Sequence, residues 1–252
     1  MINILLSGCN GKMGQVVTRL CSRHDNLKIA AGYDITDGGM NPYPVFTDLN
    51  NCKVKVDVII DFSSPAAFDG LISFAVEKKI PAVIATTGLS RDQKKMLEQA
   101  AKTIPIFYSA NMSLGINLLI DLVKKTAKLV EQNFDIEIIE KHHNQKLDAP
   151  SGTALEIADS INSVLRQKQK YVYDRHSRRT KRSRNEIGIH AVRGGTIVGE
   201  HSVIFAGNDE VIEIRHTAMS KDIFGTGALR AAEFIHVKKP GIYNMNDLIS
   251  EE

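Results

Sequence analysis

The chain opens with an apolar run that ends in three spaced glycines, Ile2-Asn3-Ile4-Leu5-Leu6-Ser7-Gly8-Cys9-Asn10-Gly11-Lys12-Met13-Gly14. Apolar residues then recur at the spacing of one helix face as far as Leu20, and a second apolar run, Leu27–Tyr33, ends at Asp34. The order is therefore strand, glycine turn, helix, strand and acid, with the acid twenty residues after the last glycine. This order is typical of a dinucleotide-binding site.

Each part of this pattern has a physical role. Glycines let the backbone approach a pyrophosphate, the helix N-terminus offers unpaired N–H groups to it, and the acid accepts hydrogen bonds from ribose hydroxyls. A strict G-x-G-x-x-G motif would need glycine where the chain has Cys9, and the actual spacing is Gly8, Gly11, Gly14. A tight turn with close helix–strand packing is the alternative interpretation.

Strands and helices continue to alternate through the first half of the chain. We expect strands at 56–62, 81–86 and 104–108, with helices at 65–79 and 90–102. Ser64-Pro65 is a helix start and Ser90-x-x-Gln93 is a capping box. Such alternation predicts an α/β fold with a doubly wound parallel sheet of Rossmann type.

Four polar or glycine-rich segments follow the expected strands, and in this fold ligands bind beyond the carboxyl ends of the strands. The segments are Gly8–Gly14, Asp34, Thr86–Gly88 and Ser109–Met112. We interpret them together as a cofactor site, although each alone is also compatible with ordinary helix capping.

The pattern changes in the second half. A long helix is expected at 114–131, followed by a strand at 136–139, a polar loop and a helix at 154–166. Apolar runs at 186–193, 196–206 and 210–216, separated by glycine-bearing turns, are typical of an antiparallel meander. We therefore expect an α+β domain with a mixed or antiparallel sheet at 114–221. The helix expected at 225–237 would return to the first domain, residues 1–113 and 222–252.

The polar loop of the second half is the candidate active site. It reads Glu140-Lys141-His142-His143-Asn144-Gln145-Lys146-Leu147-Asp148-Ala149-Pro150-Ser151-Gly152-Thr153-Ala154. The histidines and Lys146 supply cationic or proton-donating groups, and Ser151-Gly152-Thr153 opens a helix whose N–H groups suit a carboxylate. A proton donor beside an anion site, together with a nicotinamide, predicts reduction of an unsaturated carboxylate-bearing substrate.

Other interpretations of these residues remain open. The histidine pair could bind a metal together with His190, His201 or His216, but no H-x-x-x-H or H-E-x-x-H spacing supports this, and we expect no metal. Ser151 is also expected to cap the helix.

Composition limits the class of protein. With 43% hydrophobic residues, 24% charged residues and a net charge of +3, the chain is typical of a soluble globular protein without a polyanionic partner. The cysteines, Cys9, Cys21 and Cys52, lack metal-type spacing and favour a reduced, cytoplasmic setting. We expect no secretory signal and no membrane association.

One stretch of the second half is strongly basic and contains Arg175, Arg178, Arg179, Lys181, Arg182 and Arg184. Because no aromatic residues are interleaved with these charges, we expect no nucleic-acid partner. We expect instead a solvated loop or a loop that attracts an anionic substrate.

The polar loop resembles the signature of the 4-hydroxy-tetrahydrodipicolinate (dihydrodipicolinate) reductase family. The resemblance extends over nearly the whole chain. It includes the glycine turn, Asp61-Phe62-Ser63, Thr86-Thr87-Gly88, Ala110-Asn111-Met112-Ser113 and Arg193-Gly194-Gly195-x-x-x-Gly199-Glu200-His201.

The resemblance implies an enzyme of the diaminopimelate route to lysine that transfers hydride from NADH or NADPH to a cyclic dicarboxylate. His142 would be the general acid/base residue and Lys146 the second proton donor, while His143, Gly152 and Thr153 would bind the substrate carboxylates. The resemblance also implies a homotetramer built largely through the sheet of the second domain. The cofactor would contact Gly8, Cys9, Asn10, Gly11, Lys12, Met13, Asp34, Ala85, Thr86, Thr87, Ser109, Ala110, Asn111 and Met112.

Two positions depart from the family pattern. Ala85 stands where the family usually has glycine before Thr-Thr, and Ile35 stands where some members carry a cation for the NADPH 2′-phosphate. We expect a modest preference for NADH, because a carboxylate at Asp34 repels that phosphate, although Lys12 could offset the repulsion. The competing hypotheses are another two-domain oxidoreductase, such as an aspartate or homoserine dehydrogenase, and a non-catalytic dinucleotide sensor.

Overall fold

The chain forms two compact units in a computed structural model that describes residues 1–38, 41–177 and 179–251. The first unit comprises Met1–Leu114 and Lys221–Glu252, and the second comprises Gly115–Ser220. The chain therefore leaves the first unit once and returns to it for its last segment.

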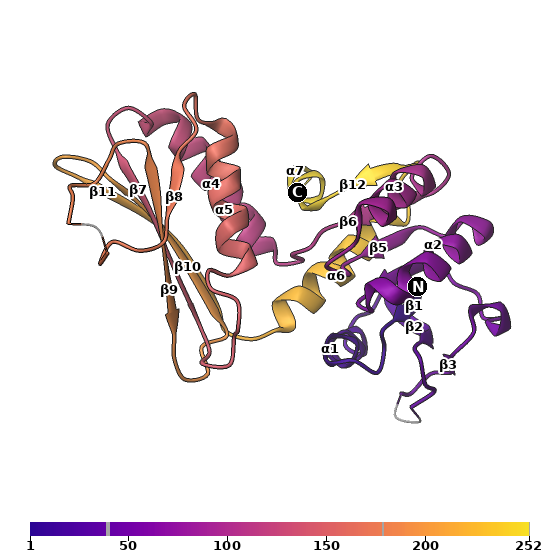
Figure 1. The fold of residues 1–252 in the computed structure, drawn as a ribbon. Coiled ribbons are helices and arrows are strands. Elements are labelled where there is room, and N and C mark those ends of the chain that lie inside the picture. The colour runs from indigo at the N-terminus through magenta and orange to yellow at the C-terminus, as the bar shows by residue number, and fades with distance from the viewer. Residues whose placement is uncertain (39–40, 178, 252) are drawn as a thin grey trace. The chain divides into compact units, whose positions relative to one another are not determined.

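The first unit is built on a parallel sheet of seven strands (Figure 1). In spatial order the strands are β12 (Gly241–Tyr243), β6 (Pro105–Tyr108), β5 (Ala82–Ile84), β4 (Val58–Asp61), β1 (Ile2–Ser7), β2 (Leu27–Tyr33) and β3 (Val45–Phe46). All six neighbouring pairs are parallel. The strand order reverses at β1, next to the glycine turn, as a doubly wound fold requires.

Helices cover both faces of this sheet. On one face α1 (Lys12–Cys21), α6 (Asp222–Ile235) and α7 (Met245–Ser250) pack on alternate strand residues such as Ile4 and Leu6. On the other face α2 (Pro65–Lys78) and α3 (Arg91–Ala100) pack on residues such as Leu5 and Ile59. The strands are thus buried on both sides, which explains their almost continuous apolar sequences.

The predicted alternation is confirmed, and the helix starts follow from local chemistry. Ser90 and Gln93 form the expected capping box of α3, and Pro65 occupies the first position of α2. Several short elements were not predicted: β3, a 3₁₀ turn at Leu49–Asn51, β8 (Lys170–Val172), β12 and α7. The edge strands β3, β8 and β12 have only two or three residues, too few for a period-two pattern, so only pairing in the sheet defines them; the equally short central strand β5 was predicted from the apolar run around it.

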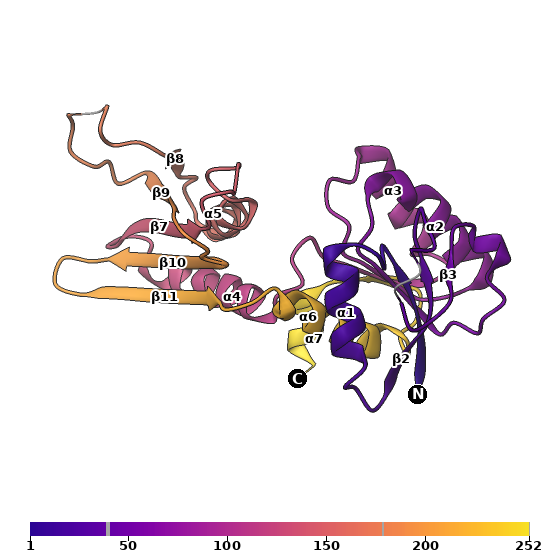
Figure 2. The same cartoon turned by 90° about the horizontal axis from the view of Figure 1, so that it is seen from below.

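The second unit is a five-stranded mixed sheet with two helices on one face (Figure 1). The order is β11 (Val211–Ala218), β10 (Gly199–Ala206), β7 (Asp135–His142), β9 (Glu186–Arg193) and β8. The helices α4 (Leu114–Val130) and α5 (Gly152–Val164) pack on Ile136, Ile138 and the apolar residues of β9 and β10. Figure 2 shows β10 and β11 as a long hairpin.

The expected mixed or antiparallel sheet is confirmed as a mixed one, but the expectation of a simple antiparallel meander is wrong beyond the β10–β11 hairpin. Strand β7 lies between β9 and β10; it pairs antiparallel with β10 but parallel with β9. The glycine turn at Gly194–Gly195 resembles a hairpin connection, yet the strands on either side of it do not pair with each other within the part of the chain described. Strand β7 carries alternating apolar residues that are best buried at the centre of the sheet, and this long-range pairing overrides the local turn.

No helix among the described residues is long and apolar enough to span a membrane.

Candidate active site

The turn between β1 and α1 is shaped by glycines. Gly8 has a φ of +76°, and a Cβ on it would lie 2.7 Å from the backbone carbonyl of Phe62. A Cβ on Gly14 would lie 2.3 Å from the Gly8 carbonyl oxygen. Gly11 precedes α1 without a side chain to cap it, so the first N–H groups of the helix are left for another acceptor. The turn therefore needs its glycines for close packing as well as for any ligand.

A pocket of about 410 Å³ lies against this turn. Within it, Asp34 Oδ2 accepts a hydrogen bond from the Asn10 N–H at 2.8 Å, and Oδ1 accepts one from the Ile35 N–H at 2.8 Å. The carboxylate is thus fixed at the end of β2, where an acid would meet ribose hydroxyls. The pocket is lined by Ser7, Gly8, Asn10, Gly11, Tyr33, Asp34, Ile35, Thr36, Phe62, Ser63, Ser64 and Ala67.

A second pocket, of about 290 Å³, shares Phe62 and Ser63 with the first. Beneath its wall the buried Asp61 accepts a hydrogen bond from Thr86 Oγ1 at 2.6 Å, which ties the end of β4 to the segment after β5. This pocket is lined by Met13, Phe62, Ser63, Ala85, Thr86, Thr87, Ala110, Met112 and Phe224. Ten of the fourteen predicted cofactor residues therefore line one pocket or the other.

The remaining four predicted residues lie close by with different surroundings. Cys9 is fully buried behind the turn, where its Sγ packs on Gly32, and burial, reinforced by Asp34, raises the pKa of its thiol to about 11. Its side chain is therefore part of the core. Lys12 is exposed at the start of α1. Ser109 Oγ donates to the Asn111 carbonyl oxygen at 2.8 Å and so shapes the loop after β6.

The sequence analysis did not assign Phe62 and Ser63 to the cofactor. Both follow β4, a central strand of the sheet, so their position at its carboxyl end was the available signal. Phe224 had no local signal, because α6 reaches this pocket only through the return of the chain.

These features fit a dinucleotide. Glycines admit a backbone-to-phosphate approach, an uncapped helix N-terminus faces the turn, and a fixed carboxylate lies at the end of β2.

In the second unit, β7 places two ionisable side chains, those of Glu140 and His142, on its apolar face. Buried residues alternate with partly exposed ones along β7, and the buried ones are Ile136, Ile138, Glu140 and His142. Glu140 and His142 therefore continue the buried face that the two isoleucines begin. Glu140 is fully buried, and its carboxylate binds Arg193, His142 and the Ser151 N–H. Burial acts to raise the pKa of the Glu140 carboxyl, but these hydrogen bonds, led by Arg193, outweigh it and hold that pKa below its usual value.

A second histidine packs against the first. His201, on β10, lies opposite Glu140 and meets the His142 ring edge-on at 5.2 Å between centroids. Its Nε2 lies 3.1 Å from Ser151 Oγ, which also accepts a hydrogen bond from the Ala154 N–H and so caps α5 as expected. Burial, and then the neighbouring His142, lowers the pKa of His201 to about 4, so this ring is neutral at physiological pH.

The loop after β7 carries the other predicted groups. Lys146 Nζ is 2.9 Å from Asp148 Oδ1, and this lysine holds the pKa of the Asp148 carboxyl below its usual value. The half-buried His143 accepts a backbone hydrogen bond from the Lys146 N–H at 3.2 Å. Gly152 and Thr153 form the first turn of α5, directly after its capping Ser151. The structure thus brings all five predicted catalytic and substrate residues to the end of β7 and the start of α5.

Glu140 and Arg193 are the site residues that the assignment from sequence omitted. Only Glu140 had a signal, because a glutamate in phase with the apolar residues of a strand must be paired when buried. The partner, from β9, could not be identified without the strand order.

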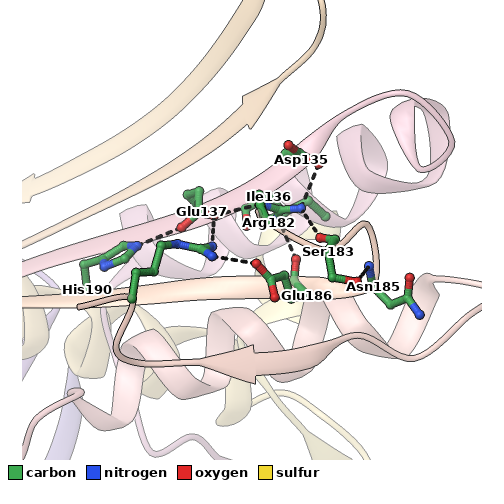
Figure 3. Close-up of polar contacts among 9 residues, drawn as sticks. Asp135, Ile136, Glu137, Arg182, Ser183, Asn185, Glu186 and His190 are labelled. Carbon is green, nitrogen blue, oxygen red and sulfur yellow. Dashed lines mark hydrogen bonds and ion pairs between the residues drawn. The ribbon is translucent and has the colours of Figure 1, made fainter. Parts of the chain in front are cut away.

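The basic stretch is only partly a solvated loop. On the partly exposed face of β7, Glu137 accepts hydrogen bonds from Arg175, Arg182 and His190, and Figure 3 shows its contacts with the last two. Arg182 also binds Asp135 at 2.7 Å, and Arg175 binds Glu186 at 2.6 Å. The expectation of a solvated or anion-attracting loop is therefore wrong for these two arginines, because carboxylates of the same sheet neutralise them. Arg179, Lys181 and Arg184 are exposed, and Arg178 lies outside the described residues.

The other histidines considered as metal ligands have separate surroundings. His190 binds Glu137, His201 meets Ser151, and the ring of His216 packs against Gly115. Across the described part of the chain, no three His, Cys, Asp or Glu side chains gather as a metal site.

Comparisons with known proteins agree with this arrangement. Residues 2–112 match the family model for the N-terminus of dihydrodipicolinate reductase, and residues 115–249 match the model for its C-terminus. The 4-hydroxy-tetrahydrodipicolinate reductase of Caldanaerobacter subterraneus subsp. tengcongensis is 56% identical, with 100% of this chain and 99% of the relative covered. That of Clostridium tetani is 49% identical, with 99% and 98% covered.

A solved structure shares the fold over the whole length. It is the dipicolinate-bound dihydrodipicolinate reductase from Paenisporosarcina sp. TG-14, which superimposes with a TM-score of 0.82 at 25% identity and covers 98% of this chain and 99% of its own. The sequence resemblance, the two family models and this structural match all point to one family. The chain belongs to the dihydrodipicolinate reductase family.

Proposed function

We propose that the chain catalyses the NAD(P)H-dependent reduction of 4-hydroxy-tetrahydrodipicolinate to tetrahydrodipicolinate, a step of the diaminopimelate route to lysine. The observation that carries the proposal is full-length identity of 56% to a reductase of that name, together with an intact His142–Lys146 loop. A related structure has dipicolinate bound, which is itself a cyclic dicarboxylate. A dehydrogenase for amino acids or a sensor would not require this combination of groups.

The second unit would bind the substrate and supply protons. His142 would act as the general acid/base residue and Lys146 as the second proton donor. The N–H groups of Gly152 and Thr153, at the start of α5, would bind a substrate carboxylate, with His143 adding a further donor. The ion pair of Lys146 with Asp148 holds the ammonium group near the loop until an anionic substrate competes for it.

The first unit would bind the dinucleotide. The Gly8–Met13 segment and the first turn of α1 would hold the pyrophosphate, while Asp34 would accept hydrogen bonds from a ribose. Ala85, Thr86, Thr87 and the segment from Ser109 to Met112 would surround the nicotinamide side. The bound nicotinamide supplies the hydride of the reaction, and the residues of this unit orient it and exclude water.

We also propose a preference for NADH over NADPH. Asp34 is fixed by two backbone N–H groups, and the neighbouring Ile35 is 90% exposed and carries no charge. A 2′-phosphate would therefore meet a carboxylate without a compensating cation at position 35. The kcat/KM for NADH should exceed that for NADPH, and Ile35→Arg should reverse the order. An advantage for NADPH in the wild-type protein would contradict this proposal.

The remaining expectations concern the whole molecule. We propose residues 1–113 and 222–252 as the dinucleotide-binding domain, and residues 114–221 as the substrate-binding and tetramerisation domain of a cytoplasmic homotetramer. The support is the partly exposed face of the five-stranded sheet, since the helices α4 and α5 pack on the opposite face. Light scattering of the purified protein would measure the assembly, and a monomeric mass would contradict it.

The test of the function is consumption of NADH or NADPH in the presence of freshly made product of the preceding synthase. His142→Ala and Lys146→Ala should each lower kcat by about 10²-fold or more, the usual scale for a positioned acid, with nearly unchanged affinity for the dinucleotide. Tight binding of the dinucleotide without any turnover would favour the sensor. Near-normal turnover of both variants would refute the assigned proton donors.

A further inference from the structure

The Glu140 carboxylate is the central acceptor of a buried network. Arg193 binds it with both terminal guanidinium nitrogens, Nη2 to Oε1 at 2.6 Å and Nη1 to Oε2 at 2.7 Å. Oε2 also lies 2.6 Å from His142 Nδ1, and Oε1 accepts the Ser151 N–H at 2.9 Å. The carboxylate is fully buried, so β7, β9 and the start of α5 are tied together at one charged group.

This network decides which nitrogen of His142 is free. An imidazole nitrogen facing a carboxylate carries the proton, so Nδ1 is the donor and Nε2 is left for chemistry. A Cβ on Gly199 would lie 3.1 Å from Nε2, so the absence of a side chain at this position leaves the nitrogen unobstructed there. The edge-on ring of His201 restricts the His142 ring from another side.

We propose that Glu140 and Arg193 are positioning residues, which hold His142 in the Nδ1–H tautomer and set the charge balance at its ring. Glu140 binds the ring directly, and Arg193 orients Glu140 and offsets its charge. The consequence for turnover rests on the function proposed above. The tautomer itself does not, because it concerns the free protein.

The two residues should act on His142 with opposite sign. The Glu140 carboxylate favours the protonated ring, and the Arg193 guanidinium disfavours it by neutralising that carboxylate. Among the described residues, the other titratable group that contacts the ring is His201 from β10, and His201 in turn has Lys146 from the loop and His216 from β11 as charged or titratable neighbours. These groups remain unchanged in variants of Glu140 and Arg193. A difference between the pH profiles of such variants therefore reports the effect of Glu140 and Arg193 on His142.

The first measurement is turnover against pH. Glu140→Gln should lower kcat by about 10²-fold and move the alkaline loss of kcat to lower pH by about one unit. Arg193→Met should move the alkaline loss of kcat to higher pH. Arg193→Lys keeps the positive charge but not the bidentate contact, so its alkaline loss of kcat should lie between those of Arg193→Met and the wild type. The KM for the dinucleotide should not change.

The sheet contains a matched control. Glu137, on the same strand, also joins arginines to a histidine, His190 (Figure 3). It lies on the opposite face of β7 from His142. Glu137→Gln should therefore lower the thermal stability of the protein and leave the pH profile of kcat in place. Equal pH shifts from Glu137→Gln and Glu140→Gln would show a general effect of sheet charge and overturn the proposal.

The second measurement is ¹⁵N NMR of the His142 ring in the free wild-type protein, which remains informative if a variant fails to fold. Protonated Nδ1 and unprotonated Nε2 are expected in the neutral ring. The opposite tautomer, or pH shifts of the same sign in Glu140→Gln and Arg193→Met, would overturn the proposal. A correct tautomer in a protein without turnover would instead refute the proposed function and leave the tautomer assignment intact.

Discussion

At the scale of single residues, burial decides what His201 contributes. Its ring is 4% exposed, and its pKa falls to about 4, whereas a histidine in an unfolded chain titrates near 6.5. Between these values the unfolded chain binds a proton that the folded protein does not, so stability falls as the pH drops through this window. Above pH ~6.5 the His201 ring is neutral in both the folded and the unfolded chain, so it no longer makes stability depend on pH.

We therefore expect protonation of His201 in the unfolded chain to lower the free energy of unfolding by on the order of 3 kcal/mol as the pH falls from ~6.5 to ~4. His201→Gln should remove this pH-dependent loss of stability while keeping a polar partner for Ser151. Urea unfolding of both proteins across the window gives the comparison. If the free energy of unfolding depends on pH in the same way in both proteins, His201 is not the group that causes the dependence.

Thr86 shows how a predicted binding residue acquires a structural role. Its hydroxyl donates to the buried Asp61, so Thr86→Val would leave a buried carboxylate oxygen without its partner. We expect a loss of about 1–3 kcal/mol in the free energy of unfolding. Thr87→Val is the control, since Thr87 is exposed and its replacement should leave stability nearly unchanged. Equal effects of the two substitutions in denaturant titrations would contradict this account.

At the scale of elements, the turn from β1 into α1 depends on atoms that glycine lacks. Gly14→Ala would place a Cβ 2.3 Å from the Gly8 carbonyl oxygen, so α1 must shift away from the turn. We expect lower stability together with a loss of dinucleotide affinity of at least tenfold, on the scale of the ~1.4 kcal/mol that such a factor represents. Calorimetric titration with NADH would measure the affinity.

The control for Gly14 is Gly70, an exposed glycine of α2 whose Cβ would meet no atom within 4 Å. Gly70→Ala should stabilise the protein by about 0.5–1 kcal/mol, because it removes backbone entropy from the unfolded chain. Unchanged affinity for NADH in Gly14→Ala would show that the turn tolerates displacement.

At the scale of the whole molecule, the last segment of the chain completes the first unit. Helices α6 and α7 contribute Ala228, Leu229, Ala232, Ile235 and Leu248 to the core on one face of the parallel sheet. Gly227 packs so closely that a Cβ would lie 1.8 Å from the Met112 carbonyl oxygen. The core of the second unit forms a separate cluster.

Gly227→Ala should therefore destabilise the first unit selectively. In hydrogen exchange, amides of β1, β4 and β5 should lose protection, while those of β7 and β10 should keep it, since their core is a different one. A uniform loss of protection across both units would mean that the chain unfolds as a single cooperative body.

The sequence by itself determined the order of the long elements and the family to which the chain belongs. Hydrophobic periodicity, capping residues and glycine turns are local properties, so β1, α1, β2, α2 and β9 appear where their residues predict them. The family resemblance was readable because the motif that carries it, the loop from Glu140 to Ala154, is a contiguous set of residues, and it is the basis for proposing His142 and Lys146 as proton donors.

Tertiary structure alone decided what depends on pairing over long distances. Strand β7 entered between β9 and β10, and this brought Arg193 to Glu140 and placed His201 opposite it. The same pairing directed Arg175 and Arg182 to Glu137, and the returning helix α6 placed Phe224 at a pocket of the first unit. Buried charges must find partners and apolar strands must find neighbours, and both requirements are met by residues far away in the sequence, which local patterns do not encode.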